Sequence, residues 1–247
     1  MDCWNSCANA AIMWQCLPVP MFGHHKSASV RVATVGLNPS STEFLNDKGD
    51  WKPATDRLPM VTDFGVRERD RLNSTDIELA GKLRVEYFQH RHHSFFGSLQ
   101  RLMTAMDVGW NYVARTAVHV DLVACGTWRK WSCVSQNARA VMEKNCHKHL
   151  MQTLGELQGD TVLLFDGKTA CEAIAEERSG SWENLGRFQD RDGDYVVVRF
   201  RSGVVTIADR SHKFAAWNYP ANRLSGDALL RIASVACEAV RANSTGE

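Results

Sequence analysis

The residues best suited to chemistry form the stretch Gly36-Leu37-Asn38-Pro39-Ser40, which directly follows a valine-rich run. That run predicts a buried strand. Glycine permits a positive φ or the close approach of a ligand, and proline removes a backbone donor and ends the hydrogen-bonded ladder. The amide of Asn38 is therefore expected at the carboxyl end of a strand, where open α/β sheets bind their ligands. An ordinary turn is the alternative, since Asn-Pro is a common turn dipeptide.

Predicted strands and helices alternate along the chain, which favours a three-layer α/β/α domain with a largely parallel sheet. Further strands are predicted over 114–122, 161–165, 195–200 and 204–208, the last two joined as a hairpin through Arg201-Ser202-Gly203. Helices are predicted over 74–89, 95–106, 135–157, 168–177 and 226–242. Residues 1–27 are expected to form an N-terminal extension with a short helix. Residues 46–73 are expected to form a long loop or insertion beside the candidate site.

Length and composition set limits on fold and partners. A chain of 247 residues with 44% hydrophobic residues is expected to form one domain, residues 1–247, with a full core. The net charge of +1 excludes a strongly basic protein, so any contact with DNA must come from a local patch. No apolar run approaches the ~18 residues of a membrane span, and no signal peptide is recognisable. We therefore expect a cytoplasmic protein without a membrane contact or an obligatory protein partner.

The cysteines do not form a recognisable metal or disulfide framework. Eight are present, and no two are spaced as Cys-x-x-Cys. Isolated cysteines are typical of small buried side chains in a reducing compartment, so no metal and no cofactor is predicted. Cys3, Cys7 and Cys16 with His24 and His25 leave a loosely spaced zinc site as an alternative.

Three segments together resemble a known family. The stretch 36–40 resembles the first motif of the uracil-DNA glycosylase superfamily, whose members carry Gly-x-Asn-Pro or Gly-x-Asp-Pro after the first strand. The segment 162–168 resembles that family's third strand, which ends on the base-reading side chain, here Asp166. The segment 205–212 resembles the strand before the second motif, although no His-Pro-Ser is present. The resemblance spans about residues 28–242 in layout and implies a central, mainly parallel, four-stranded sheet.

The resemblance also implies an activity. Such enzymes flip a nucleotide out of DNA and hydrolyse its N-glycosidic bond, which leaves an abasic site. Asn38 would position the attacking water, and Ser211 and His212 would donate to the base or to flanking phosphates. A histidine in isolation is more often structural or at the surface, and this remains the alternative for His212, whose catalytic role depends on its position in the motif. The residues expected around the base are Gly36, Leu37, Pro39, Ser40, Phe44 and Asp166. Phe44 is preferred over Trp51 as the side chain that stacks on the base.

Two departures from the uracil-specific pattern favour another base. Enzymes specific for uracil carry a tyrosine after the motif proline, and the small Ser40 leaves room for a substituent at C5. An ionised Asp166 only accepts hydrogen bonds, so it would repel O4 of uracil and match the exocyclic amine of cytosine. Capping of the following helix is the alternative role for Asp166. The expected substrate is a hydroxymethylated or glucosylated cytosine of phage DNA, and the expected role is antiviral defence.

DNA is the predicted partner, and the loop 210–224 mixes cations with apolar side chains that suit phosphates and a wedge. The predicted DNA-binding residues are Arg210, Lys213, Trp217, Tyr219, Arg223 and Leu224. An irregular surface loop with buried aromatics is the alternative. Lys168 is the nearest lysine to consider for lyase chemistry, but a monofunctional glycosylase is expected. Repair of uracil, hypoxanthine or other deaminated bases, and a non-catalytic nucleic-acid-binding module of the same fold, remain alternative functions.

Overall fold

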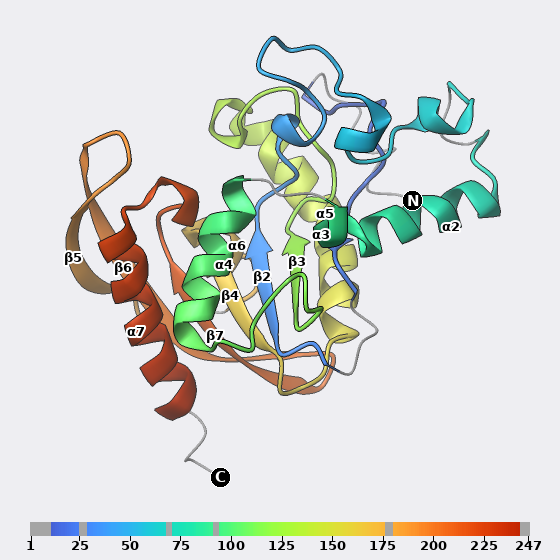
Figure 1. Cartoon of the computed structure of the whole chain (residues 1–247). Coiled ribbons are helices and arrows are strands. Elements are labelled where there is room, and N and C mark those ends of the chain that lie inside the picture. The colour runs from blue at the N-terminus through green and yellow to red at the C-terminus, as the bar shows by residue number, and fades with distance from the viewer. Residues whose placement is uncertain (1–10, 25–28, 68–70, 91–93, 176–179, 243–247) are drawn as a thin grey trace.

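A mixed sheet of seven strands forms the centre of the computed structural model (Figure 1). The structure describes residues 11–24, 29–67, 71–90, 94–175 and 180–242. The strands lie in the order β1-β3-β2-β4-β7-β6-β5. Their bounds are β1 Met21–Phe22, β2 Val32–Gly36, β3 Ala117–Asp121, β4 Val162–Asp166, β5 Glu183–Gln189, β6 Tyr195–Ile207 and β7 Arg210–Trp217.

Four neighbouring strands, β3, β2, β4 and β7, run parallel to one another. The other three strands extend both edges: β1 pairs antiparallel with β3, and β6 and β5 follow β7 antiparallel. The expectation of a four-stranded, mainly parallel sheet is therefore wrong in its strand count and in the share of antiparallel pairing. The α/β class itself is confirmed.

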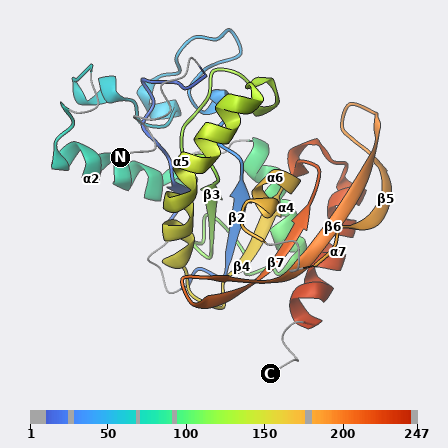
Figure 2. The same cartoon turned by 180° about the vertical axis from the view of Figure 1, so that it is seen from behind.

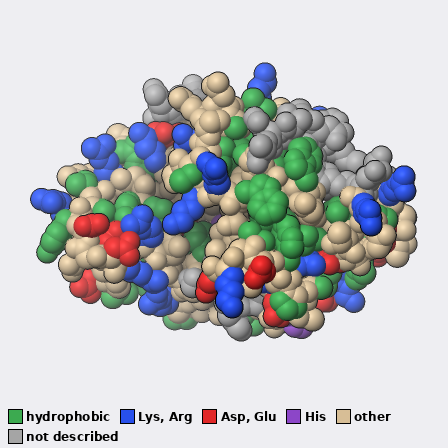
Figure 3. Space-filling view, turned by 90° about the horizontal axis from the view of Figure 1, so that it is seen from above, with side chains coloured by type: hydrophobic (Ala, Val, Ile, Leu, Met, Phe, Trp, Pro, Cys, Tyr) green, Lys and Arg blue, Asp and Glu red, His purple; other side chains and the backbone are tan. Residues whose placement is uncertain are grey.

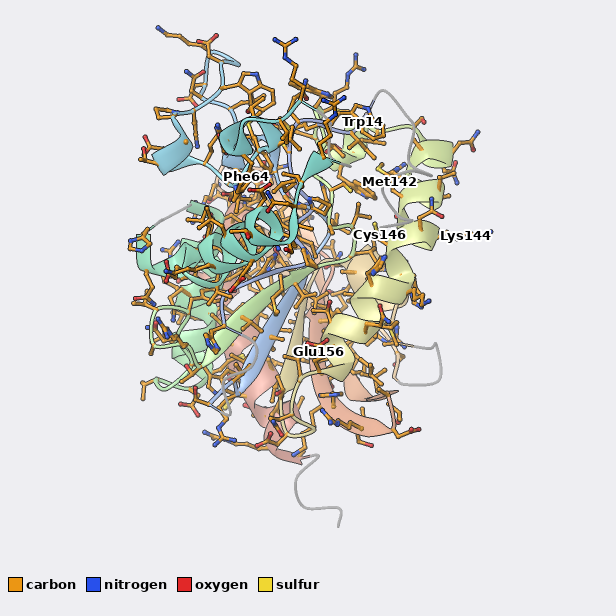
Figure 4. The ribbon with its side chains drawn as sticks, turned by 90° about the vertical axis from the view of Figure 1, so that its right-hand side faces the viewer. Trp14, Phe64, Met142, Lys144, Cys146 and Glu156 are labelled. Atoms are coloured by element: carbon orange, nitrogen blue, oxygen red, sulfur yellow. The ribbon has the colours of Figure 1, made fainter. Side chains whose placement is uncertain are left out.

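Helices cover both faces of the sheet. Helices α4 (Ser94–Met106) and α7 (Gly226–Ala242) lie on one face (Figure 1), and α5 (Gln136–Gly155) and α6 (Lys168–Glu172) lie on the other (Figure 2). Every residue of β2, β3 and β4 is buried, as expected for strands that are covered on both sides. Helix α5 directs Met142 and Cys146 into the body of the protein and Lys144 away from it (Figure 4).

Most predicted elements occur close to their expected positions. The helix predicted from residue 74 is α2 (Ser74–Val85) followed by α3 (Tyr87–His90), and Asn73 is its N-cap. The helix predicted over 168–177 ends earlier, at Glu172. The short helix expected within 1–27 falls largely outside the described residues. Among the described residues, no helix has both the length and the hydropathy that a bilayer crossing requires.

The predicted hairpin at residues 201–203 is wrong. Strand β6 runs without interruption through Arg201, Ser202 and Gly203, and the chain reverses at Ala208 and Asp209. These two residues have φ values of 48° and 63°. Their positive φ values suit the tight two-residue turns that join twisted antiparallel strands. Residues 210–212, which were compared with the family's second motif, therefore lie at the beginning of β7 and not after the end of a strand.

The described residues of the segment 46–73, which are 46–67 and 71–73, are irregular, as predicted, and side chains anchor them. They contain the 3₁₀ helices Ala54–Asp56 and Val61–Phe64. The buried guanidinium of Arg57 donates through Nη1 to Asp63 Oδ2 at 2.6 Å and to the Leu58 carbonyl at 3.2 Å. A second bond from Nη2 makes the Arg57–Asp63 pair bidentate. This loop is therefore held in place beside the sheet.

Candidate active site at the carboxyl end of the parallel strands

A cavity of about 550 Å³ opens at the carboxyl end of the parallel strands. Its volume lies in the range of small-molecule sites. The cavity is lined by Phe22, Gly36, Leu37, Asn38, Pro39, Ser40, Thr42, Glu43, Leu45, Asp47, Lys52, Phe95, Phe96, His119, Asp121, Asp166, Pro220 and Asn222. Figure 3 shows this end of the molecule from above. A larger groove of about 1180 Å³ between α2 and α5 contains neither the 36–40 stretch nor Asp166.

The amide of Asn38 is held by its nitrogen. Nδ2 donates to the carbonyl of Pro39 at 3.0 Å and to Thr127 Oγ1 at 3.1 Å. A carbonyl only accepts, and Thr127 uses its own proton on the carbonyl of Arg129 at 2.7 Å. Both neighbours therefore require a donor, which fixes the orientation of the amide. The oxygen of Asn38 is left for the cavity, where it can accept a hydrogen bond from a water or a ligand.

Asp166 presents one carboxylate oxygen to the cavity. Its Oδ1 accepts from Trp217 Nε1 at 2.7 Å and from the Ala221 amide at 2.8 Å. The described residues give Oδ2 no hydrogen-bond partner. Burial raises the pKa of Asp166 to about 6, although the bonds from Ala221 and Trp217 and the nearby His119 act in the opposite direction. The carboxylate is thus an oriented acceptor near neutral pH. The alternative role as a cap of α6 is not seen, because that helix has no side-chain cap.

A second buried carboxylate, Asp121, lies beside Gly36 in the sheet. Its Oδ1 is 3.2 Å from His119 Nε2, and His119 Nδ1 is 2.8 Å from Thr34 Oγ1. The hydroxyl of Thr34 also contacts that of Tyr112, so a chain of buried polar groups runs from the core to the cavity. A carboxylate oxygen accepts, so a hydrogen bond within this pair has His119 Nε2 as its donor. The sequence predicts both residues near the end of a strand but not their pairing at the site, and the β2–β3 register places them beside Gly36.

Aromatic rings form one wall of the cavity, and Phe44 is not among them. Phe95 and Phe96 from the start of α4 line the cavity, and their ring centroids lie 5.6 Å and 5.0 Å from that of His119. Phe95 is half-buried and so the better placed to stack on a ligand. Phe44 is fully buried in the core against Gly126, which corrects the prediction that it stacks on the base.

Ser211 and His212 lie at the opposite end of the sheet from Asn38. The register pairs Asp166 with Trp217, five residues further along β7 than His212. At about 3.3 Å per strand residue this separates His212 from the cavity end by ~16 Å. His212 is fully buried and donates through Nδ1 to the Thr161 carbonyl at 3.1 Å. Burial lowers its pKa, so it is a neutral core histidine and the predicted catalytic role is wrong.

The predicted DNA-binding residues are occupied by internal contacts. Arg210 donates to the carbonyls of Gly155 and Leu157, and Trp217 and Leu224 are buried. Tyr219 and Arg223 both bond Asp190, which ties the loop after β7 to the β5–β6 hairpin. The alternative of an irregular loop with buried aromatics therefore fits residues 210–224 better than a DNA-binding surface does. Lys213 belongs with Ser211 at the far end of β7.

The loop after β7 brings Pro220 and Asn222 to the cavity. Both lie within the loop 210–224 that was predicted to contact DNA, but neither was predicted to line the base site. The sequence signal for them is Tyr219-Pro220, because this is the first proline after the last strand.

No group of three or more metal-ligating side chains occurs in the part of the chain that the structure describes. The zinc alternative depends in part on Cys3, Cys7 and His25, which lie outside the described residues. Cys16, Cys125 and Cys171 are buried, as predicted, whereas Cys133 is exposed and Cys237 is half-buried. Cys146 is disulfide-bonded, which differs from the expectation of isolated thiols.

Comparison with known proteins adds no identification. No family model matches the chain. Searches of curated proteins and of solved structures likewise find no significant match.

Proposed function

We propose that this chain is a monofunctional DNA glycosylase that takes a flipped pyrimidine nucleotide into the cavity at the carboxyl end of the parallel strands. The observation that carries the proposal is the orientation of Asn38. Its nitrogen is held by Pro39 and Thr127, so its oxygen is available in a cavity that also presents the carboxylate of Asp166. The stretch 36–40, which resembles the family's first motif, and Asp166, which matches the family's base-reading position, thus line the same cavity.

The chemistry needs an aligned water and a base that can leave. The oxygen of Asn38 accepts a hydrogen bond from the water and directs its lone pair at C1′. As the C–O bond forms, the bond from C1′ to the base breaks and its electron pair leaves with the base. The proton released by the water passes to solvent. Because an amide is a poor base, alignment contributes most of the effect.

The carboxylates favour a base with an exocyclic amine. Asp166 Oδ2 accepts from the N4 amine of cytosine and would repel O4 of uracil. Asp121 adds a second carboxyl group to the same cavity. Ser40 is exposed, and its hydroxyl is engaged with Thr42, so no large side chain from this position closes the cavity. A 5-substituted cytosine such as a hydroxymethylated or glucosylated cytosine fits these features, and removal of such bases suits defence against phages with modified DNA.

Base release from defined oligonucleotides tests the proposal. The substrates carry one cytosine, 5-hydroxymethylcytosine, glucosylated 5-hydroxymethylcytosine or uracil, and alkaline cleavage reports abasic sites. We expect release from the 5-substituted cytosines. Asn38→Ala should slow it by about 10²–10³-fold, the usual effect of losing one oriented polar contact to the transition state. Asn137→Ala, an exposed position at the start of α5, is the matched control.

Two outcomes would contradict the proposal. Release from uracil alone would assign the chain to repair of deaminated bases. DNA binding without release from any substrate, with Asn38→Ala unchanged, would assign it to a non-catalytic binding module.

A further inference from the structure

Two exposed tryptophans touch each other on loops beside the cavity. Trp51 is 38% exposed and Trp128 is 40% exposed, and their ring centroids are 5.4 Å apart at an interplanar angle of 62°. They come from segments more than 70 residues apart in the sequence. Large aromatic surface left in contact with water marks an interaction site more often than an isolated apolar residue does.

The pair is continuous with the candidate active site. Trp51 forms an isolated antiparallel bridge with Leu45, and Leu45 and Lys52 line the cavity. Trp128 directly follows Thr127, the residue that holds the amide of Asn38. A ligand that stacks on these rings therefore lies at the cavity rim and contacts the loop that orients Asn38. In Figure 3, hydrophobic side chains gather in the middle of this end of the molecule.

Cations are close to both tryptophans in the sequence. Arg129 and Lys130 follow Trp128 and are exposed. Lys48 precedes Trp51 and is exposed, whereas the next residue, Lys52, donates through Nζ to the Thr42 carbonyl at 2.6 Å. The carboxylates of Asp47 and Asp50 share the latter loop, so the excess of positive charge lies on the side of Trp128. Aromatic faces interleaved with cations match a nucleic-acid strand, whose bases stack on the rings while its phosphates contact the cations.

We propose that Trp51 and Trp128 form a stacking platform for unpaired bases of the DNA strand that enters the cavity. The inference rests on the proposed function, because it takes the cavity to hold a nucleotide of the same strand. Stacking tolerates every base, so the platform holds the strand while the cavity supplies the selection. The consequence is a preference for single-stranded or locally unpaired DNA over intact duplex.

Binding of two matched probes tests the platform without any catalysis. One probe is a fluorescein-labelled 12-mer of thymidine, and the other is a 12-mer with the same phosphates and tetrahydrofuran in place of every nucleoside. The wild-type protein should bind the thymidine probe at least about tenfold more tightly and show quenched tryptophan fluorescence. The double variant Trp51→Ala/Trp128→Ala should bind both probes equally, because stacking is lost and the cations remain.

Single variants separate stacking from general apolar contact. Trp128→Phe keeps an aromatic face and should retain most of the preference for the thymidine probe, whereas Trp128→Leu should lose it. Leu230→Ala, at a 62% exposed position on α7, is the control. Thermal unfolding of each variant shows whether it is folded.

Equal binding of both probes by the wild-type protein, or an unchanged preference for the thymidine probe in Trp128→Leu, would overturn the platform. Equal binding of both probes is also the result expected if the two tryptophans contact another protein and not DNA. Base release is measured separately. A probe preference without base release would leave the platform standing and reject the glycosylase. Base release that is unchanged in the double variant on single-stranded substrate would reject the platform alone.

Discussion

An asparagine side chain can present either its oxygen or its nitrogen, and at Asn38 the neighbours decide which. Thr127 supplies one of the two acceptors that hold Nδ2, and its own proton is used on Arg129. Thr127 lies 89 residues from Asn38, so no local sequence pattern would connect them. The threonine is therefore a positioning residue for the proposed water.

Replacement of Thr127 by valine tests this positioning. Thr127→Val keeps the shape and removes one of the two acceptors. Only the Pro39 carbonyl then holds the amide nitrogen, so the amide turns its nitrogen towards the cavity more often. We expect single-turnover base release to slow by about tenfold, which corresponds to ~1.4 kcal/mol, with little change in DNA affinity. Thr127→Ser retains the hydroxyl and should restore the rate. Equal rates for the valine and serine variants would contradict the role.

Asp166 should make activity depend on pH, because only its ionised form is a pure acceptor for an amine. Burial raises its pKa to about 6. We expect kcat/KM for a cytosine-type substrate to fall as the pH drops below about 6. Asp166→Asn can donate a hydrogen bond to O4, so it should lose the acidic limb and shift base preference from cytosine towards uracil. An unchanged pH profile in this variant would show that Asp166 does not read the base.

The same carboxylate should also affect stability. The folded pKa of Asp166 lies above the unfolded value near 3.8, so its contribution is present at low pH and is lost as the pH rises through about 6. Asp166→Asn removes a buried charge and can keep an acceptor for Trp217 and Ala221. The variant is expected to gain roughly 3 kcal/mol relative to wild type at pH 8, and little at pH 4. Urea unfolding at the two pH values measures the difference.

At the scale of the elements, the close contact between β2 and β3 makes Gly36 necessary. A Cβ atom at Gly36 would lie 2.8 Å from Asp121 Oδ1 and 2.9 Å from His119 Cε1. Both contacts are shorter than real Cβ contacts, so the buried pair would have to move. Gly36→Ala is expected to cost about 1–3 kcal/mol, as overpacking does, and to lower base release. Gly97→Ala is the contrast, since nothing lies near that Cβ in α4 and a stabilisation of ~0.5–1 kcal/mol is expected. Similar melting shifts for both variants would contradict this explanation.

The elements also show where sequence reasoning succeeds. The strands β2 and β4 are apolar runs because both of their faces are buried, so the sequence predicts Asn38 and Asp166 at strand ends. The helices α4 and α5 are predicted separately, from the helical spacing of their apolar residues. Prediction from the sequence fails at the turn between β6 and β7. Ser202-Gly203 looks like a turn but lies within a strand, and the true turn uses Ala208 and Asp209, which carry no glycine signal for positive φ.

At the scale of the whole molecule, the misplaced turn between β6 and β7 assigned the wrong end of the last strand to the predicted site. A strand read as ending at residue 208 delivers Ser211 and His212 to the cavity, whereas a strand that ends at Trp217 delivers Pro220 and Asn222. The His119–Asp121 pair was missed for a related reason. Alternating polar residues in a strand suggest a solvated face, and only the pairing of Gly36 with Asp121 shows that this face is buried at a cavity.

This polarity gives a prediction for the two ends of the molecule. Substitutions at the amino end of β7 lie about 16 Å from the cavity end, so Ser211→Ala/Lys213→Ala should keep base release within about twofold of wild type. Asn222→Ala removes an amide that lines the cavity and should slow release by about tenfold or more. Single-turnover assays on one modified oligonucleotide compare the two variants directly. Because β2, β4 and β7 are parallel, only the carboxyl end of β7 lies at the same edge of the sheet as Asn38 and Asp166. Loss of activity in the Ser211/Lys213 variant, with full activity in Asn222→Ala, would therefore place the chemistry at the opposite edge.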